Sequence, residues 1–139
     1  MSSTHIIGKV VLIEQPAFAL FNLFSDMRNF MMAVPLDKRE GITFGEDYIE
    51  GEVKGMKVGV KIDSKIPISK ISYKDREGGS PFPFTLSVFF NSIDSYKTEF
   101  HIELEAQMNF AIKMMIGSKL EEGINELTEK IAQAFKQHI

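Results

Sequence analysis

Residues 96–137 read YKTEFHIELEAQMNFAIKMMIGSKLEEGINELTEKIAQAFKQ, and their hydrophobic period changes in the middle. From 96 to 108, apolar and polar residues alternate, which is the period of a half-buried β-strand. From 110 to 137, apolar residues recur at helical spacing. Asn109, a residue type favoured at helix N-caps, stands between the two patterns. The segment predicts a long strand that leads directly into a long amphipathic helix.

The two predicted elements suit two packed layers. Alternation gives the strand an inward face made of Tyr96, Thr98, Phe100, Ile102, Leu104, Ala106 and Met108. The helix carries one apolar stripe made of Ile112, Ile116, Leu120, Ile124, Leu127, Ile131 and Ala134 or Phe135. At 1.5 Å per residue the helix is about 40 Å long, longer than a small domain is wide. We therefore expect its stripe to lie along the apolar face of a sheet.

The preceding part of the chain supplies further strands. Alternating or β-branched runs predict strands at 42–44, 48–53, 58–62, 70–74 and 84–90. Turn signals separate these runs, and the longest is Asp-Arg-Glu-Gly-Gly-Ser-Pro-Phe-Pro at 75–83. This pattern predicts an antiparallel meander with one apolar face and one solvated face.

The N-terminal part predicts a strand and two short helices. The run at 5–13 is β-branched and short, as in a strand. Pro16 suits the first position of a helix at 17–24. Asp26 is then a natural N-cap for a second helix at 27–34.

Gly117 and Gly123 interrupt the long predicted helix. Glycine in a helix interior costs about 1 kcal/mol relative to alanine. Room for a ligand, close packing against the sheet and a bend in the helix are three explanations that the sequence leaves open.

The chain has 139 residues, a length that fits one domain at 1–139. It contains no cysteine, which excludes disulfides and thiolate chemistry. It has 12 Phe and 8 Met but no Trp, which suits either a core rich in Phe and Met or a pliable apolar cavity.

Charge and hydropathy limit the cellular locations and the classes of binding partner that we expect. The net charge of −3 gives no broad basic surface, so we expect no nucleic-acid partner. No run approaches the roughly 20 apolar residues that span a bilayer. The first residues lack the basic and apolar regions of a secretory signal, so a cytoplasmic protein is expected.

The order strand, two short helices, about six strands and a long C-terminal helix resembles the START-like, or SRPBCC, superfamily. The Pro16-led helix, Asp26 at the second helix, Val-Gly-Val-Lys-Ile at 58–62 and Gly-Ser-Lys-Leu-Glu-Glu-Gly-Ile at 117–124 are similar to small bacterial members. The resemblance covers essentially the whole chain. It implies an α+β helix-grip fold, in which a curved antiparallel sheet of about six to seven strands surrounds the C-terminal helix.

The resemblance also implies a cavity for an apolar or amphipathic ligand between sheet and helix. Candidate lining residues are Met31, Val58, Val60, Ile62, Tyr73, Phe84, Leu86, Val88, Phe90, Tyr96, Phe100, Ile102, Leu104, Ile112, Met115, Ile116 and Leu120. A simple core role is the alternative for each of them.

Catalytic and metal chemistry find little support in the sequence. His5 and His138 lie near the chain ends, and alternation places His101 on the outward face of its strand. No Gly-x-Ser-x-Gly elbow occurs, and Gly78-Gly79-Ser80 lacks the context of a phosphate loop. We therefore predict no catalytic set, no metal site and no cofactor.

Three functions remain. The leading hypothesis is a non-catalytic carrier or sensor of a small hydrophobic molecule, such as a lipid, an isoprenoid or an aromatic metabolite. The second is a polyketide cyclase- or dehydratase-type enzyme that uses Tyr73 or Tyr96 as an acid–base group. The third is a protein-interaction module, including a homodimer, that uses the outward Phe89 or the Phe82 and Phe84 loop.

Overall fold

The computed structural model describes residues 2–31, 36–53, 55–76 and 82–136. The elements follow in the order β1 (Ser2–Ile7), β2 (Val11–Ile13), α1 (Ala17–Phe24), α2 (Arg28–Met31), a 3-10 turn η1 (Leu36–Lys38), β3 (Thr43–Phe44), β4 (Tyr48–Val53), β5 (Met56–Ile66), β6 (Lys70–Asp75), β7 (Phe84–Asp94), β8 (Lys97–Met108) and α3 (Phe110–Lys136). Strand, two short helices, meander and long helix were all predicted in this order.

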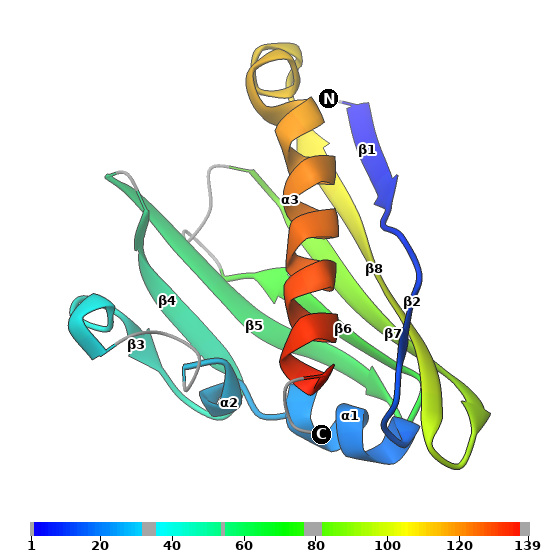
Figure 1. Cartoon of the computed structure of the whole chain (residues 1–139). Coiled ribbons are helices and arrows are strands. Elements are labelled where there is room, and N and C mark those ends of the chain that lie inside the picture. Colours follow the sequence, from blue (N-terminus) through cyan, green and yellow to red (C-terminus); the bar gives the residue numbers. More distant parts are fainter. Residues whose placement is uncertain (1, 32–35, 54, 77–81, 137–139) are drawn as a thin grey trace.

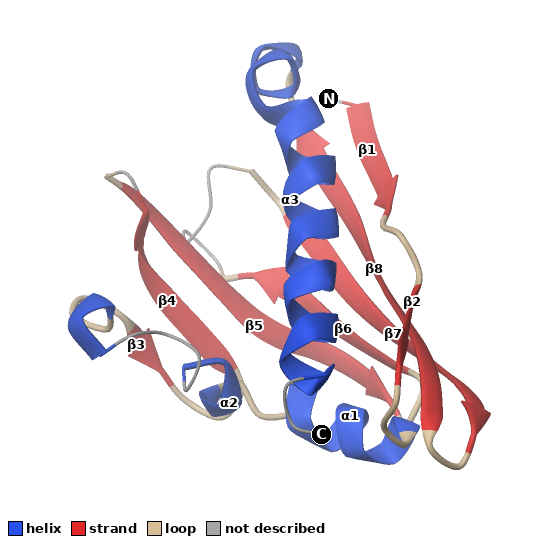
Figure 2. Ribbon diagram, viewed as in Figure 1, coloured by secondary structure: helices blue, strands red, loops and turns tan. Residues whose placement is uncertain are grey.

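The strands form one antiparallel sheet in the order β1-β8-β7-β6-β5-β4-β3, and β2 also pairs with β8. The first strand therefore lies beside the last one. The sheet curves, and α3 lies across its concave side (Figures 1 and 2). This is the predicted α+β helix-grip architecture.

The predicted strand and helix both form; in the helix Leu127 of the predicted stripe is 44% exposed, and the strand has one exception. Side chains from Thr98 to Met108 alternate between the core and the outward face. Asn109 caps α3 by accepting a hydrogen bond from the N–H of Ile112 (2.9 Å). Tyr96 is the exception, because β7 continues to Asp94 and the hairpin turn falls on Ser95 and Tyr96. Its side chain is 74% exposed, so the prediction that it faces inward is wrong.

The predicted strand at 5–13 is divided in two, because α3 comes close at the break. A Cβ on Gly8 would lie 2.8 Å from the carbonyl oxygen of Ile102 and 2.8 Å from Cγ2 of Ile124. Next to it, the N–H of Lys9 donates to Oδ1 of Asn125 (3.0 Å), and the Lys9 ammonium pairs with Glu129. The helix is thus fixed to the edge of the sheet formed by β1, β2 and β8. These are also the strands that α3 contacts.

The two glycines of α3 are not explained by close packing. Among the described residues, nothing lies within 4 Å of a Cβ placed on Gly123, and only a side-chain atom of Lys113 does so at Gly117. Figure 1 shows the first turns of α3 end-on, whereas the rest of the helix runs along the page, so the helix bends. Gly–Ser pairs are a common cause of bends, and Gly117-Ser118 follows the first two turns.

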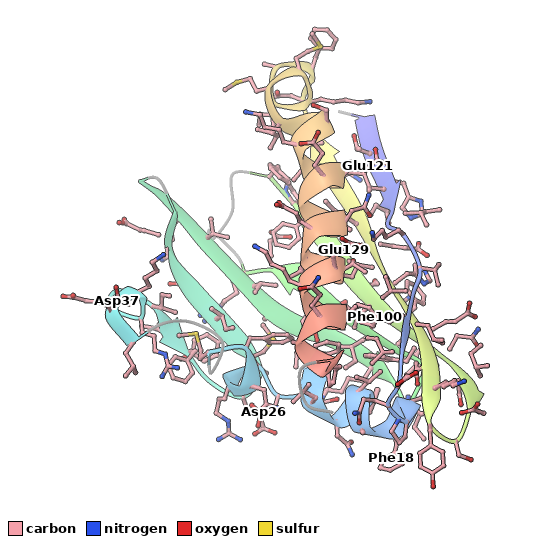
Figure 3. All side chains as sticks on the ribbon, in the orientation of Figure 1. Phe18, Asp26, Asp37, Phe100, Glu121 and Glu129 are labelled. Carbon is pink, nitrogen blue, oxygen red and sulfur yellow. The ribbon has the colours of Figure 1, made fainter. Side chains whose placement is uncertain are left out.

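Phenylalanines fill the end of the concave side that α1 and α2 cover. Phe24 is stacked on Phe30 and Phe90 at centroid distances of 5.5 and 5.7 Å, and it lies 5.5 Å from Phe100. Phe24, Phe90 and Phe100 are each at most 4% exposed. We call this set, with Phe30, the phenylalanine cluster; Phe100 is labelled in Figure 3. Much of the Phe excess thus serves a packed core.

Candidate functional site

The concave face changes character along its strands. Strand pairing aligns Ile62, Tyr73, Leu86 and Leu104 in one row across the sheet. The next row toward the phenylalanine cluster contains Ile71, Val88 and Ile102, which are all buried. In the opposite direction Ala106 and Met108 on β8 are buried, whereas apolar side chains on β4, β5 and β7, from Ile62 and Leu86 onward, stay partly exposed. We call these residues the open band: Ile49, Val58, Val60, Ile62, Phe84 and Leu86.

The open band extends across the sheet from β7, which is next to β8, to β4 near the opposite edge. Its strands β4, β5 and β7 continue the sheet away from β8, whereas α3 contacts β1, β2 and β8. Around the helix axis, Leu127 lies about 200° from Asn125, whose side chain accepts the hydrogen bond from Lys9 next to β2. Leu127 is 44% exposed, and Gly123 lies on the same flank of the helix. An apolar flank of α3 therefore points away from the anchored edge.

Asp75 adds a carboxylate to this face. By strand alternation it shares the concave side with Ile71 and Tyr73, and it pairs in register with Val60. Its Oδ1 accepts a hydrogen bond from the N–H of Phe84 (2.9 Å). The carboxylate is half-buried and lies beside two residues of the open band.

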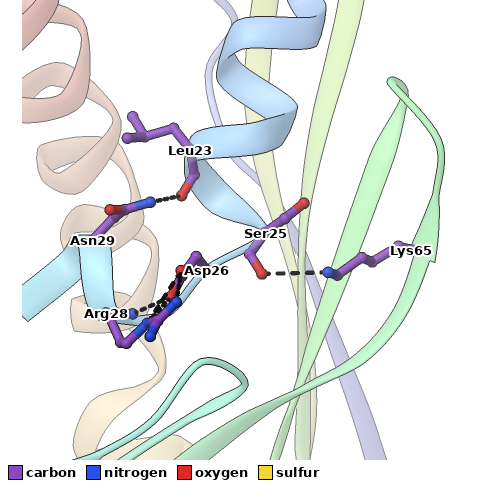
Figure 4. Close-up of polar contacts among 6 residues, drawn as sticks. All are labelled: Leu23, Ser25, Asp26, Arg28, Asn29 and Lys65. Carbon is purple, nitrogen blue, oxygen red and sulfur yellow. Dashed lines mark hydrogen bonds and ion pairs between the residues drawn. The ribbon is translucent and has the colours of Figure 1, made fainter.

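A β-bulge brings a cation to the other end of β5. The pairing shifts between Ile62 and Ser64, so Lys65 comes opposite the buried Ile71 instead of facing outward. The Lys65 ammonium donates to the carbonyl of Ser25 at the end of α1 (3.3 Å; Figure 4). Together with Ser25, Glu46, Asp47 and Ile62, it lines a surface hollow of about 420 Å³.

The connection between α1 and α2 beside this hollow is held by polar bonds. Asp26 caps α2 as predicted, because its Oδ1 accepts the N–H of Arg28 (3.0 Å). The Arg28 guanidinium hydrogen-bonds to the same carboxylate and holds the pKa of Asp26 below its ordinary value. Nδ2 of Asn29 donates to the carbonyl of Leu23 (2.9 Å; Figure 4). These bonds fix the lower rim of the concave face.

The two tyrosines proposed as acid–base groups do not form a catalytic pair. The Tyr73 hydroxyl donates to the carbonyl of Phe24 (2.6 Å) in the buried core. Burial raises the pKa of Tyr73 well above its ordinary value. Tyr96 lies in the exposed hairpin turn. The Tyr73 bond joins α1 to β6 and has a structural role.

The outward face carries a layer of partnered side chains. Phe89 stacks on the His101 ring at 4.7 Å, and the Lys70 ammonium lies 5.2 Å from the Phe89 centroid. Glu103 accepts from His101 (2.9 Å) and from His5 (3.0 Å), and these bonds lower its pKa. Phe89 therefore faces outward as predicted but is half-buried, and His5 lies in β1. Within the described ranges, no group of His, Asp and Glu is arranged to hold a metal.

The structure divides the predicted lining residues into three groups. Buried in the core are Met31, Tyr73, Val88, Phe90, Phe100, Ile102 and Leu104. Partly buried are Val58, Val60, Ile62, Phe84, Leu86, Ile112, Ile116 and Leu120. Exposed are Tyr96 and Met115, the latter at 73%. Met115 was included among the lining candidates that the START-like resemblance implied, but its angle on the helix turns it outward.

Three residues of the site were missed from the sequence. Ile49 pairs in register with Val60 and packs against the core cluster. The predicted strand bounds 48–53 and 58–62 would pair Ile49 with Ile62 instead of Val60, but either partner places Ile49 on the concave face, and this was the signal that was missed. Asp75 was assigned to a loop, and Lys65 depends on a bulge that has no clear signature in the sequence.

Comparison with known proteins gives relatives in fold only. No family model matches the chain, and no curated protein matches it in sequence. Norcoclaurine synthase from Thalictrum flavum, as a point mutant with a transition-state analogue, matches with a TM-score of 0.74 at 10% identity, over 99% of this chain and 98% of that chain. A further structure of that synthase is a complex with dopamine and hydroxybenzaldehyde.

Two bacterial structures match over similar lengths. A START superfamily protein from Mycobacterium smegmatis has a TM-score of 0.63 at 13% identity, over 99% of each chain. A protein from Rhizobium loti has a TM-score of 0.61 at 15% identity, over 96% of this chain and 99% of that chain. The chain therefore has the START-like helix-grip fold that the sequence predicted. Among the described helices, none is long and apolar enough to cross a membrane.

Proposed function

We propose that the chain, acting as one domain over residues 1–139, binds a small hydrophobic molecule against the open band. The observation that carries this proposal is the contrast in burial along one strand face. Val88 and Phe90 are 5% and 4% exposed, whereas Phe84 and Leu86 on the same face of β7 remain half-buried. A ligand that covers partly exposed aliphatic and aromatic side chains on a concave surface removes their apolar area from water, and this lowers the free energy of the complex.

The chemistry of the face favours an apolar ligand with few polar groups. The open band supplies aliphatic and phenyl surface, and the Leu127 flank of α3 adds to it. Asp75 offers one carboxylate for orientation. A lipid, an isoprenoid or an aromatic metabolite fits this surface. A protein of the same fold, norcoclaurine synthase, forms a complex with dopamine and hydroxybenzaldehyde, which supports a small-molecule ligand for this chain.

A cyclase- or dehydratase-type activity has less support. It requires a tyrosine whose hydroxyl faces the ligand beside a carboxylate or histidine. The Tyr73 hydroxyl is instead bonded to the Phe24 carbonyl, and Tyr96 is in the hairpin turn. We therefore propose ligand binding rather than catalysis, although norcoclaurine synthase has the same fold.

Native mass spectrometry of gently purified protein, followed by solvent extraction, tests for a retained ligand. A titration with the neutral fluorescent probe N-phenyl-1-naphthylamine tests the site. Val60→Gln places an amide in the open band, and we expect it to weaken probe binding about tenfold because the amide loses water without a partner.

Lys61→Gln is the matched control, because Lys61 is the next residue of β5 and faces outward. It should bind the probe like the wild type. Equal affinity of wild type, Val60→Gln and Lys61→Gln, with unchanged folding, would place the ligand elsewhere and overturn the proposal.

A further inference from the structure

The first two turns of α3 expose an unusual amount of apolar surface. Phe110, Met114 and Met115 are 77%, 71% and 73% exposed. The segment 110–116 reads FAIKMMI, so Lys113 is its one charged residue. A helix that is apolar on nearly all sides is normally buried on all sides. Here Ile112 and Ile116 are partly buried, and the other side faces solvent.

The exposed residues share one face. At 100° per residue, Phe110, Met114, Ala111 and Met115 fall within an arc of about 140°. Lys113 lies beside this arc, about 60° from Phe110 on the other side. Between Glu105 and Glu121 the sequence has two lysines and no acidic residue. We call Phe110, Ala111, Met114 and Met115 the helix tip.

The helix tip is at the open end of the concave face. Phe84 of the open band pairs in register with Ala106, close to the end of β8 at Met108. α3 begins directly afterwards, at Phe110. In Figure 1 its first turns stand at the top of the molecule, whereas α1, α2 and the β7–β8 hairpin lie at the opposite end. The bend near Gly117 turns the tip away from the axis of the rest of α3.

We infer that the helix tip docks on the surface of a lipid bilayer. Three side chains at about three-quarters exposure offer roughly 400–500 Å². A stable protein interface buries about 800 Å² per partner, so the tip alone is too small for a lasting dimer. Apolar side chains that enter the acyl boundary while neighbouring lysines reach the phosphate groups suit a shallow interfacial helix. The area suits reversible rather than permanent attachment.

Vesicle co-sedimentation of the full chain, without added ligand, tests this inference. The vesicles contain phosphatidylcholine with about one quarter phosphatidylserine. We expect the wild type to sediment with them and the double variant Met114→Ser/Met115→Ser to bind at least tenfold more weakly. Lys113→Gln should weaken binding to these vesicles and leave binding to pure phosphatidylcholine nearly unchanged.

The matched control removes apolar surface from the opposite end of the molecule. Ile93 and Tyr96 of the β7–β8 hairpin are 53% and 74% exposed, and Ile93→Ser/Tyr96→Ser should sediment like the wild type. A wild type that does not bind vesicles, or a tip variant that binds them equally well, would overturn the inference. So would a wild-type dimer that the tip variant converts to a monomer, because the tip would then cover a second copy. Since no ligand is present, these results are independent of the proposed ligand site.

Discussion

The two ends of the concave face are built from the same strands but are finished differently. On β7, Val88 and Phe90 are buried under the phenylalanine cluster, whereas Phe84 and Leu86, on the same side of the same strand, are half-buried. The difference comes from what covers each end. α1 packs on β6 and β7 at the closed end. α3 is held at the β1, β2 and β8 edge of the sheet by the contacts of Gly8, Asn125 and Glu129.

This comparison teaches that alternation decides which face a residue takes but not whether that face is covered. Phenylalanines close one end because their rings reach one another, with Phe90 and Phe100 at 5.8 Å. The shorter side chains of Ile49, Val60 and Ile62 on β4 and β5 leave surface that remains in contact with water. Stability should therefore depend on the closed end and ligand binding on the open end.

The largest effect is expected at the closed end. Phe100 is fully buried and contacts Phe24 and Phe90, so Phe100→Ala should lower the free energy of unfolding by about 3–5 kcal/mol. Phe84→Ala, in the open band, should cost only about 1 kcal/mol, because its side chain is already partly hydrated. Urea denaturation of both variants measures the difference. Similar losses at the two positions would show that the ends do not differ.

A smaller effect should follow from disturbing the anchor of α3. Gly8→Ala puts a Cβ 2.8 Å from a backbone oxygen and from Ile124, so it should destabilise the fold by about 1–3 kcal/mol. Gly123→Ala is the matched control, since nothing described lies near its Cβ. It should stabilise the protein by up to about 1 kcal/mol through helix propensity.

The same pair of variants bears on the role of Gly123. If Gly123 leaves room for a ligand, Gly123→Ala should weaken binding of the fluorescent probe while it raises the melting temperature. Unchanged probe affinity would remove the ligand explanation. A destabilised Gly123→Ala with a wild-type-like Gly8→Ala would contradict the anchor described for α3.

A smaller loss than at Phe100 is also expected for the bond that joins α1 to the sheet. Tyr73→Phe removes the hydrogen bond to the Phe24 carbonyl and should cost about 1–2 kcal/mol near neutral pH. Because burial raises the pKa of Tyr73, the folded state keeps its proton when the unfolded chain loses its own, near pH 10. The stability of the wild type should therefore fall above that pH.

Tyr73→Phe lacks this ionisation, so its deficit relative to the wild type should shrink as the pH rises from about 9 to 11. Parallel urea curves at each pH measure that deficit. A deficit that stays constant or grows with pH would contradict a buried, neutral Tyr73.

Much of the fold could be predicted because the decisive signals are local. The change of period at Asn109, the strand at 48–53 and the helix at 17–24 each follow from a short run of residues. The site was predicted less completely, because it depends on pairing and coverage. Tyr96 was misplaced by the end of a hairpin, and Met115 by the face of a helix turn.

Lys65 shows most clearly what the sequence does not contain. Strict alternation from Val60 would place Lys65 on the outward face. The bulge between Ile62 and Ser64 reverses this, and its cause is the pairing of β5 with β6. Likewise, the composition of 12 Phe and 8 Met could not separate a packed core from a cavity, because composition does not show which side chains are covered.

The central claim, that one end of the concave face is open and the other is closed, can be tested by thiol labelling. The chain has no cysteine, so Leu86→Cys and Val88→Cys each carry a single thiol, two residues apart on one face of β7. We predict that the Leu86→Cys thiol reacts with a maleimide in the folded protein and is protected by N-phenyl-1-naphthylamine, whereas the Val88→Cys thiol reacts only after unfolding. Equal reactivity of the two thiols, or a reactive Leu86→Cys that saturating probe does not protect, would contradict the account.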